Sequence, residues 1–255
     1  PISTSLSGNG NFLYTLANST NIASDANGCI FFRAGVTDTR YAISTTHWGN
    51  EKALTISQSP FTDGDWHTIT YRQTNGQGEI YVDGNLAVSG TISLNPKAVG
   101  ATPYNFIGRP CYVGDAYLKD AMYHDFRIYK GAVDASTLAT FSQNLAALNA
   151  ALYEIQIAAL MDKVTLDATV LYEDIALPTP SENGVTITWT SSQPSVISAA
   201  GQVVRPAVGK ADAQVTLTAT FTKGTVSKQK SFVVTVPALQ DDASSVQDDL
   251  DAIVL

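Results

Sequence analysis

The stretches FTDGDWHTITY, at residues 61–71, and GEIYVDGNLAV, at residues 78–88, decide the fold of this chain. In the first, the polar turn Asp63-Gly64-Asp65 precedes a run whose side chains alternate between two faces, which predicts a strand from Trp66 to Tyr71. In the second, Asp83-Gly84 stands between two β-rich runs, and this dipeptide is the strongest short-range signal for a hairpin. Together the two stretches predict antiparallel strands joined by tight turns.

Two further short runs follow, NFIGR at residues 105–109 and FRIY at residues 126–129, and both are predicted strands. Strands this short, at this even spacing, are typical of an antiparallel sandwich. In this order the four segments resemble the laminin-G-like, concanavalin-type jelly roll, and the resemblance covers residues 8–141. It implies a mainly β fold with a concanavalin-like jelly-roll sandwich over residues 1–133. It implies much less about function, which depends on the site that a fold carries.

The resemblance also concerns the start of this domain. Members of the family usually have about two more strands before the point that residues 11–14 match, and their absence would leave an exposed sheet edge able to pair with other chains. We therefore expect an N-terminally truncated jelly roll. The chain opens at Pro1 without a basic and apolar leader segment, which favours a fragment of a longer protein.

A helical pattern begins at Asp134, which has the position of an N-cap because its carboxylate can accept the free amides of a first helical turn. Apolar residues, mostly Leu, then recur at helical spacing as far as Leu160, in a stretch without Gly or Pro. The pattern predicts a connector of one or two helices over residues 134–163. We expect its leucine-rich face to pack on one or both neighbouring domains.

β signals return after Thr165, and about seven short strands within ~75 residues are typical of an immunoglobulin-like sandwich. The segment ITWTSSQPSVISAAGQVVRP, followed by two long strands of alternating pattern, resembles the atrophied bacterial immunoglobulin-like domains. The resemblance covers residues 164–238 and implies a spacer beside catalytic or binding modules of secreted polysaccharide-degrading enzymes, with Trp189 in its core. Residues 239–255 are acidic and then amphipathic, which predicts a linker or the start of a further domain.

Composition restricts the partners of the chain. Its 255 residues are 44% hydrophobic and 15% charged, enough for one large domain or two modest domains with cores. The net charge is −8, and without clustered Lys and Arg the chain is not expected to bind nucleic acid. No run approaches the roughly 18 apolar residues of a membrane helix, so no membrane insertion is expected.

The two cysteines, Cys29 and Cys111, leave two interpretations open. A disulfide between them would close a loop of about 80 residues and could add roughly 4 kcal/mol of stability. Two unpaired buried thiols is the simpler interpretation, because a free cysteine behaves as a small apolar residue.

No catalytic set is recognisable. Hydrolysis of a glycoside usually needs two facing carboxylates, and most candidates here stand in turns that explain them structurally; they are Glu51, Asp65, Glu79, Asp83, Asp115, Asp120 and Asp125. The closely spaced Glu-x-Asp-x-Glu set of the glucanases that share the resembled fold does not occur. The histidines His47, His67 and His124 have no metal-ligand spacing. We therefore expect that this chain is not an enzyme.

Calcium is the ion to consider, and it enters through the resemblance. Jelly rolls of this kind often bind one structural Ca²⁺ near the final strand through Asp carboxylates and loop carbonyl oxygens. Asp125 falls within the family's usual Asp-Asp-Phe-Arg run, although His124 stands at the preceding position here. Asp125 is thus the candidate ligand for a possible structural Ca²⁺.

A sugar-binding site needs planar aromatic rings together with amides, Arg or carboxylates that reach hydroxyl groups. Trp48 stands in a polar loop between His47 and Asn50, where the burial of an indole is hard to arrange. Aromatic and polar residues also alternate around Arg109 and Tyr112. The sequence therefore predicts carbohydrate contacts by these five residues.

The features favour a non-catalytic accessory region, in which a carbohydrate-binding module and a spacer stand beside a neighbouring catalytic domain of the same polypeptide. By resemblance, the parent would be a secreted, cell-surface or periplasmic bacterial glycoside hydrolase acting on arabinose-containing plant polysaccharide. The alternative is an adhesion or structural module that binds protein or only spaces its neighbours. A hydrolase in its own right is the third interpretation and has the least support.

Overall fold

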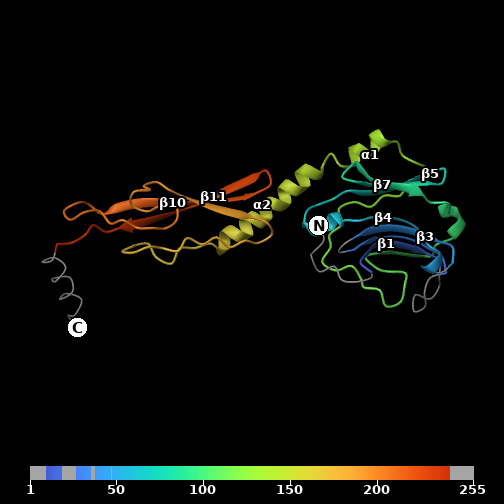
Figure 1. Cartoon of the computed structure of the whole chain (residues 1–255), viewed down its shortest axis with the longest axis horizontal. Coiled ribbons are helices and arrows are strands. Elements are labelled where there is room, and N and C mark those ends of the chain that lie inside the picture. The colour runs from blue at the N-terminus through green and yellow to red at the C-terminus, as the bar shows by residue number, and fades with distance from the viewer. Residues whose placement is uncertain (1–9, 19–26, 36–37, 47, 242–255) are drawn as a thin grey trace. The chain divides into compact units, whose positions relative to one another are not determined.

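The computed structural model describes residues 10–18, 27–35, 38–46 and 48–241, and it divides the chain into two compact units (Figure 1). Unit 1 ends at Asn149 and unit 2 begins at Ala150. The division falls inside a helix of the predicted connector, so each unit includes part of that segment.

Unit 1 contains a five-stranded antiparallel sheet with the strand order β4-β3-β2-β1-β8. Its strands are β1 (Phe12–Ala17), β2 (Cys29–Ala34), β3 (Thr39–Ser44), β4 (Lys52–Ile56) and β8 (Tyr104–Ile107). Side chains alternate between its two faces. Across β2, β3 and β4, the partners Phe32, Tyr41 and Leu54 point inward, while Phe31, Ala42 and Ala53 point outward.

The second sheet of unit 1 has three antiparallel strands in the order β5-β6-β7. They are β5 (Ile69–Thr74), β6 (Gln77–Val82) and β7 (Asn85–Thr91). Both turns are two-residue turns with positive φ at each position, 49° and 78° at Asn75-Gly76 and 52° and 79° at Asp83-Gly84. Positive φ at both positions matches the twist of the flanking strands and favours Asn-Gly and Asp-Gly.

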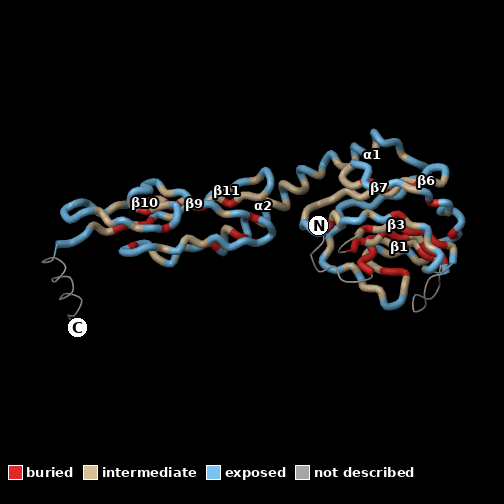
Figure 2. Tube along the Cα trace, in the orientation of Figure 1, coloured by how far each residue is buried: buried red, intermediate tan, exposed pale blue. Residues whose placement is uncertain are grey.

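The two sheets stack around a common core. Leu13, Phe32 and Ile43 of the five-stranded sheet pack with Ile80 and Ile92 of the other layer, and all are buried. Figure 2 shows buried positions gathered in the five-stranded sheet, around β1 and β3. The predicted jelly-roll sandwich is thus confirmed.

The prediction that a strand starts at Trp66 is wrong, because β5 begins at Ile69. The backbone amide of Trp66 donates to the Asn149 side chain at 2.7 Å, and that of Thr68 donates to the Asp83 carboxylate at 2.8 Å. These amides are satisfied by side chains, so the ladder starts later.

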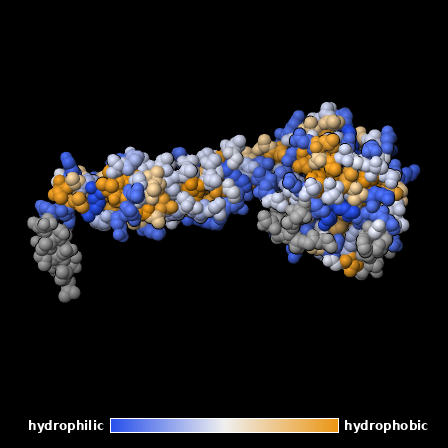
Figure 3. Space-filling model, in the orientation of Figure 1, coloured by the Kyte–Doolittle hydropathy of each residue, from blue (hydrophilic) through white to orange (hydrophobic). Residues whose placement is uncertain are grey.

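The predicted strand at Phe126–Tyr129 is also wrong, because this segment pairs with no strand in the described part of the chain. Its rings pack against other rings instead: the ring centre of Phe126 lies 5.4 Å from that of Tyr14, and the ring of Tyr129 stacks on that of Phe141 at 5.7 Å. Ile128 stays 69% exposed. Figure 3 shows that apolar side chains reach the surface of unit 1 on the face drawn there.

The predicted helical segment consists of α1 (Ala135–Phe141) and α2 (Leu145–Lys163). Asp134 caps α1 as expected, and its carboxylate accepts the Thr137 amide at 2.7 Å. In unit 1, Leu138 is buried. In unit 2, Ile157 and Leu160 of α2 lie in the hydrophobic core. Each unit therefore buries apolar residues of the connector.

By length and composition, the stretch Ala135–Lys163 could cross a membrane, although the sequence had suggested no such run. Two observations favour a helix packed on protein. The stretch breaks between Phe141 and Leu145, and two of its apolar residues, Ile157 and Leu160, are at most 1% exposed within unit 2.

Unit 2 is built on a three-stranded antiparallel sheet, β11-β10-β9, formed by β9 (Thr186–Ser191), β10 (Ala213–Lys223) and β11 (Val226–Val236). Trp189 lies in its core as expected, and its indole donates to the Pro178 carbonyl at 2.9 Å. Of the about seven short strands expected, the described part of unit 2 has these three and two isolated bridges, Ile197 to Val203 and Val170 to Thr235. Ile197 is fully buried in the same core cluster.

His67 links the turn at Asp63-Gly64-Asp65 to the turn at Asp83-Gly84. Its Nδ1 lies 2.8 Å from the Asp83 carboxylate, and its Nε2 lies 3.0 Å from that of Asp63. Burial lowers the pKa of His67, but hydrogen bonds and charges from Asp83 and Asp63 outweigh it and raise this pKa to about 9. At neutral pH an imidazolium therefore bridges the two carboxylates.

We expect this bridge to make unit 1 less stable in alkali. Because the folded-state pKa lies above the unfolded value of about 6.5, the stabilisation is complete below that pH and is lost as the pH rises through about 9. Urea unfolding at about pH 6 and about pH 10 measures the loss. His67→Gln should remove this part of the pH dependence, whereas the control His124→Gln should keep it. Equal pH profiles for the wild type and His67→Gln would contradict the assignment.

The buried part of α2 should be needed for the stability of unit 2. We expect Ile157→Ala to lower the free energy of unfolding by about 2–5 kcal/mol and Ile157→Val by about 1 kcal/mol. Ile155→Ala on the same helix is the matched control, because Ile155 is 68% exposed and its loss should cost less than about 0.5 kcal/mol. Denaturant unfolding followed by circular dichroism distinguishes the three. Equal effects of the two alanine variants would mean that α2 does not belong to this core.

Candidate functional site

The outer face of the five-stranded sheet is apolar and is covered by the segment that follows β8, residues 109–117, which we call the cover segment. The hydroxyl of Thr15, in β1, donates to the Arg109 carbonyl at 2.9 Å, and the Asn11 amide donates to the Ala116 carbonyl at 2.9 Å. Between these anchors, Cys111 is buried in the outer core layer. The cover segment is thus attached to the sheet near both of its ends.

A polar network lies where the cover segment meets the loop before β4. The Tyr112 hydroxyl donates to the Glu51 carboxylate at 2.6 Å, and Glu51 also forms an ion pair with Arg40 of β3. The Glu51 side chain is only 8% exposed, so these two partners offset the cost of burying its charge. Burial, followed by the nearby Cys29, raises the pKa of Tyr112, which keeps its hydroxyl a donor.

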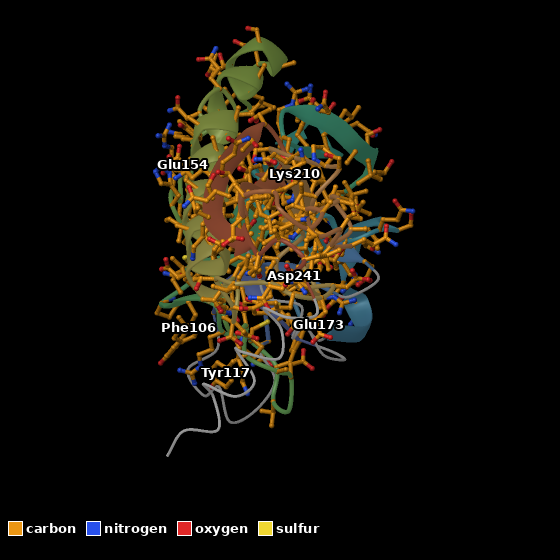
Figure 4. All side chains as sticks on the ribbon, turned by 90° about the vertical axis from the view of Figure 1, so that its left-hand side faces the viewer. Phe106, Tyr117, Glu154, Glu173, Lys210 and Asp241 are labelled. Carbon is orange, nitrogen blue, oxygen red and sulfur yellow. The ribbon has the colours of Figure 1, made fainter. Side chains whose placement is uncertain are left out.

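An aromatic and cationic group lies on the same face. The guanidinium of Arg109 is 4.6 Å from the ring centre of Phe106 and 5.7 Å from that of Tyr117, and Figure 4 labels both rings. Phe106 lies on β8 opposite Thr15, which places its side chain on the outer face. Tyr117 is 52% exposed. We call these three residues the Arg109 stack.

Arg109 has no carboxylate partner in the parts of the chain that the structure describes, and its buried Nε has no hydrogen-bond acceptor there. Arg33 and Arg40, also on the outer face of the sheet, differ, because each pairs with an acidic residue. The Nε is buried and does not reach an external group, so an external acceptor would have to bind the terminal amino groups of the guanidinium, which lies against two rings.

The predicted site residues have different outcomes. Tyr112 binds Glu51, the residue after Asn50, and no hydrogen bond joins Tyr112 to Asn50 itself in the described part of the chain. Asn50 is exposed, and its amide donates to the Thr46 hydroxyl at 3.1 Å. Trp48 opens the short 3-10 helix Trp48–Asn50, but its side chain lies outside the described part, as does the whole of His47.

Sequence reasoning missed two residues of this face. Phe106 lies in a predicted strand and was not proposed as a site residue. It stands two positions from Tyr104 on β8, so both side chains lie on the outer face. Arg40 carried a clearer signal, because a charged residue in a strand, directly before the apolar run Tyr41–Ile43, must find a partner. The partner, Glu51, could not be read from the sequence, since it is fixed by the fold.

The residues around Asp125 do not fit a calcium ion. Its carboxylate forms an ion pair with Arg127 at 2.6 Å. The positively charged guanidinium therefore occupies a position beside the carboxylate, and it would repel a calcium ion there. Within the described ranges, no three His, Cys, Asp or Glu side chains gather in a way that could hold a metal. Asp125 is explained by its pairing with Arg127.

Two protein-family models match parts of the chain. Residues 7–139 match the family described as the Concanavalin A-like lectin/glucanases superfamily, and residues 149–239 match the Atrophied bacterial Ig domain. An alpha-L-arabinofuranosidase of Bifidobacterium longum subsp. longum is 30% identical over 250 residues, an alignment that covers 93% of this chain and 21% of that enzyme. The chain therefore spans about a fifth of the length of this relative.

Two solved structures are more distant. One contains residues 221–444 of an S-layer domain-containing protein from Clostridium thermocellum, with 22% identity, coverage of 54% of this chain and 65% of that chain, and a TM-score of 0.29. The other concerns botulinum neurotoxin type C, whose cell entry depends on interaction with two ganglioside molecules; it has 11% identity, coverage of 87% and 53%, and a TM-score of 0.35. Neither likeness supports an argument at these scores.

The first family match covers just over half of the chain and coincides with the two stacked sheets of unit 1. The second coincides with the β region of unit 2. The chain therefore belongs to the concanavalin A-like lectin/glucanase superfamily through residues 7–139, and an atrophied bacterial Ig domain follows that region.

Proposed function

We propose that this chain is a non-catalytic, carbohydrate-binding accessory region of a polysaccharide-degrading enzyme, with unit 1 as the binding module and unit 2 as a spacer. The observation that carries the proposal is the Arg109 stack, where an Arg that has no carboxylate partner among the described residues lies against Phe106 and the half-exposed Tyr117. A planar ring can stack on the face of a sugar while guanidinium donors reach its hydroxyl groups. The lectin-type family and the glycosidase relative support this assignment.

The absence of catalysis is part of the proposal and is supported by the state of the carboxylates. Glycoside hydrolysis needs one acid and one base or nucleophile that face each other with a sugar between them. In unit 1, Glu51 is bound by Arg40 and Tyr112, and Glu79 is bound by Arg72 and Tyr81. The remaining candidates also have partners; they are Asp83 with His67, Asp125 with Arg127, and Asp65, Asp115 and Asp120 with other groups.

The arabinofuranosidase relative supports a finer proposal. We place the chain in a secreted or surface-attached bacterial protein, beside a catalytic domain of the same polypeptide that acts on arabinose-containing polysaccharide. In that setting the module would raise the local concentration of substrate near the catalytic domain. A weak module is useful there, because the second contact of a tethered pair is intramolecular.

A second candidate function is adhesion through protein, and one observation favours it. Between residues 122 and 129, several large apolar side chains are strongly exposed; they are Met122, Tyr123, Phe126, Ile128 and Tyr129. Exposed apolar residues that gather in one segment are a common feature of protein-binding surfaces. This surface does not include the Arg109 stack, so substitutions can separate the two functions.

We expect the full chain to bind arabinan, arabinoxylan or pectic fragments with a dissociation constant on the order of 10⁻⁴ M in titration calorimetry. Arg109→Ala, Tyr117→Ala and Trp48→Ala should each weaken binding about tenfold. Arg109→Lys should also bind more weakly, because it keeps the charge and loses the planar contact with both rings. Arg127→Ala is the matched control, since Arg127 is an exposed Arg that lies 5.8 Å from the ring of Phe141, outside this face.

Two outcomes would contradict the proposal in different ways. A wild-type chain that binds no glycan of a plant and host panel would favour the adhesion function. Glycan binding that survives all three alanine substitutions would place the site elsewhere on unit 1.

A further inference from the structure

The two cysteines of the chain lie together under the cover segment. Cys29 is the first residue of β2 and points to the outer face of the sheet, and Cys111 lies in the cover segment that closes over this face. Their exposures are 0% and 2%, and both belong to the same core cluster. The hydroxyl of Tyr112, which follows Cys111, is 3.4 Å from the Cys29 sulfur. The fold thus places side by side two thiols that are 82 positions apart.

The thiols also interact directly with each other. A hydrogen bond from Cys111 is the main cause that lowers the pKa of Cys29, and the same bond together with burial raises the pKa of Cys111. Cys29 is therefore the sulfur that ionises first, and it faces a protonated thiol. No other Cys, and no metal-binding group of His, Asp or Glu, competes for them within the described ranges.

We propose that Cys29 and Cys111 form an oxidative cross-linking site, at which an external disulfide converts the two thiols into a bond that ties the cover segment to β2. The inference goes beyond the proposed function and does not depend on glycan binding. It needs only an oxidising surrounding, in which disulfides form and persist.

The reaction is a pair of thiol–disulfide exchanges. The thiolate of one cysteine attacks one sulfur of the external disulfide, forms a mixed disulfide and releases one thiol. The thiolate of the other cysteine then attacks the protein sulfur of this mixed disulfide and releases the second thiol. The protein loses two electrons and two protons, and the external disulfide gains both, so that it becomes two thiols.

Burial decides when the bond forms and how long it lasts. With exposures of 0% and 2%, neither sulfur meets an external disulfide in the folded state, so the exchange belongs to folding, before the cover segment closes. Once formed, the bond is equally protected from reductants. The reduced protein holds the cover segment by hydrogen bonds such as Thr15 to Arg109 and Asn11 to Ala116, and the bond would add a covalent link between them.

The full chain, unfolded and reduced, is refolded in a mixture of reduced and oxidised glutathione set to an oxidising poise. We expect non-reducing peptide mass spectrometry to find Cys29 and Cys111 in one cross-linked pair, and thiols titrated after unfolding to fall at least about tenfold below the reduced protein. We expect the melting temperature to rise by about 5–10 °C, because the bond restricts the unfolded chain. Without denaturant, a reductant should fail to open the bond.

The controls separate the effect of the Cys29–Cys111 disulfide on the melting temperature from other effects of oxidation. The reduced wild-type chain, kept in reductant, has the same side chains without the bond and is the matched control for the melting temperature. Cys29→Ser and Cys111→Ser should show no gain in melting temperature under oxidising conditions. Because only two cysteines exist, a disulfide-linked dimer on a non-reducing gel would reveal intermolecular bonds. Two free thiols per refolded chain, or a lower melting temperature in the cross-linked form, would overturn the proposal.

Discussion

Phe31 and Phe32 are neighbours in β2, point to opposite faces of the five-stranded sheet, and are each 1% exposed. A sheet that is apolar on both faces must be covered on both, because either bare face would expose a large apolar area to water. The inner face is covered by the β5-β6-β7 sheet, as in any sandwich. The outer face is covered by the irregular cover segment. The candidate functional groups of unit 1 lie in or beside this segment because the outer face has to be covered.

A loop that covers an apolar face brings its own polar groups to the rim. Tyr112 packs with Phe31 and Phe12 at ring distances of 5.8 and 6.2 Å, while its hydroxyl reaches Glu51. Arg109 has the same dual character, with its carbonyl bound by Thr15 and its guanidinium against two rings. The two residues differ in electrostatics, since Tyr112 joins a charge pair that is already satisfied whereas Arg109 does not. A ligand therefore gains more from Arg109.

Features set by a few consecutive residues could be predicted from the sequence. The turn at Asp83-Gly84 depends on positive φ that Gly adopts freely and Asp tolerates, and the cap at Asp134 depends on a carboxylate three residues before the Thr137 amide. The late start of β5 and the missing strand at Phe126–Tyr129 depend on partners far along the chain. For the same reason the sequence named Arg109 and Tyr112 but not Phe106, and it left the relation between the two cysteines open.

Unit 2 shows what happens when a sheet has one apolar face. In β10, Val215, Leu217, Ala219 and Phe221 are buried, and Thr residues alternate with them. The Thr face is satisfied across strands, for example by the 2.9 Å contact of the Thr218 and Ser231 hydroxyls. Such a face can remain in water, so it requires no covering loop and gains no polar rim. The contrast gives a physical reason why unit 1 provides the candidate site while unit 2 is suited to act as a spacer.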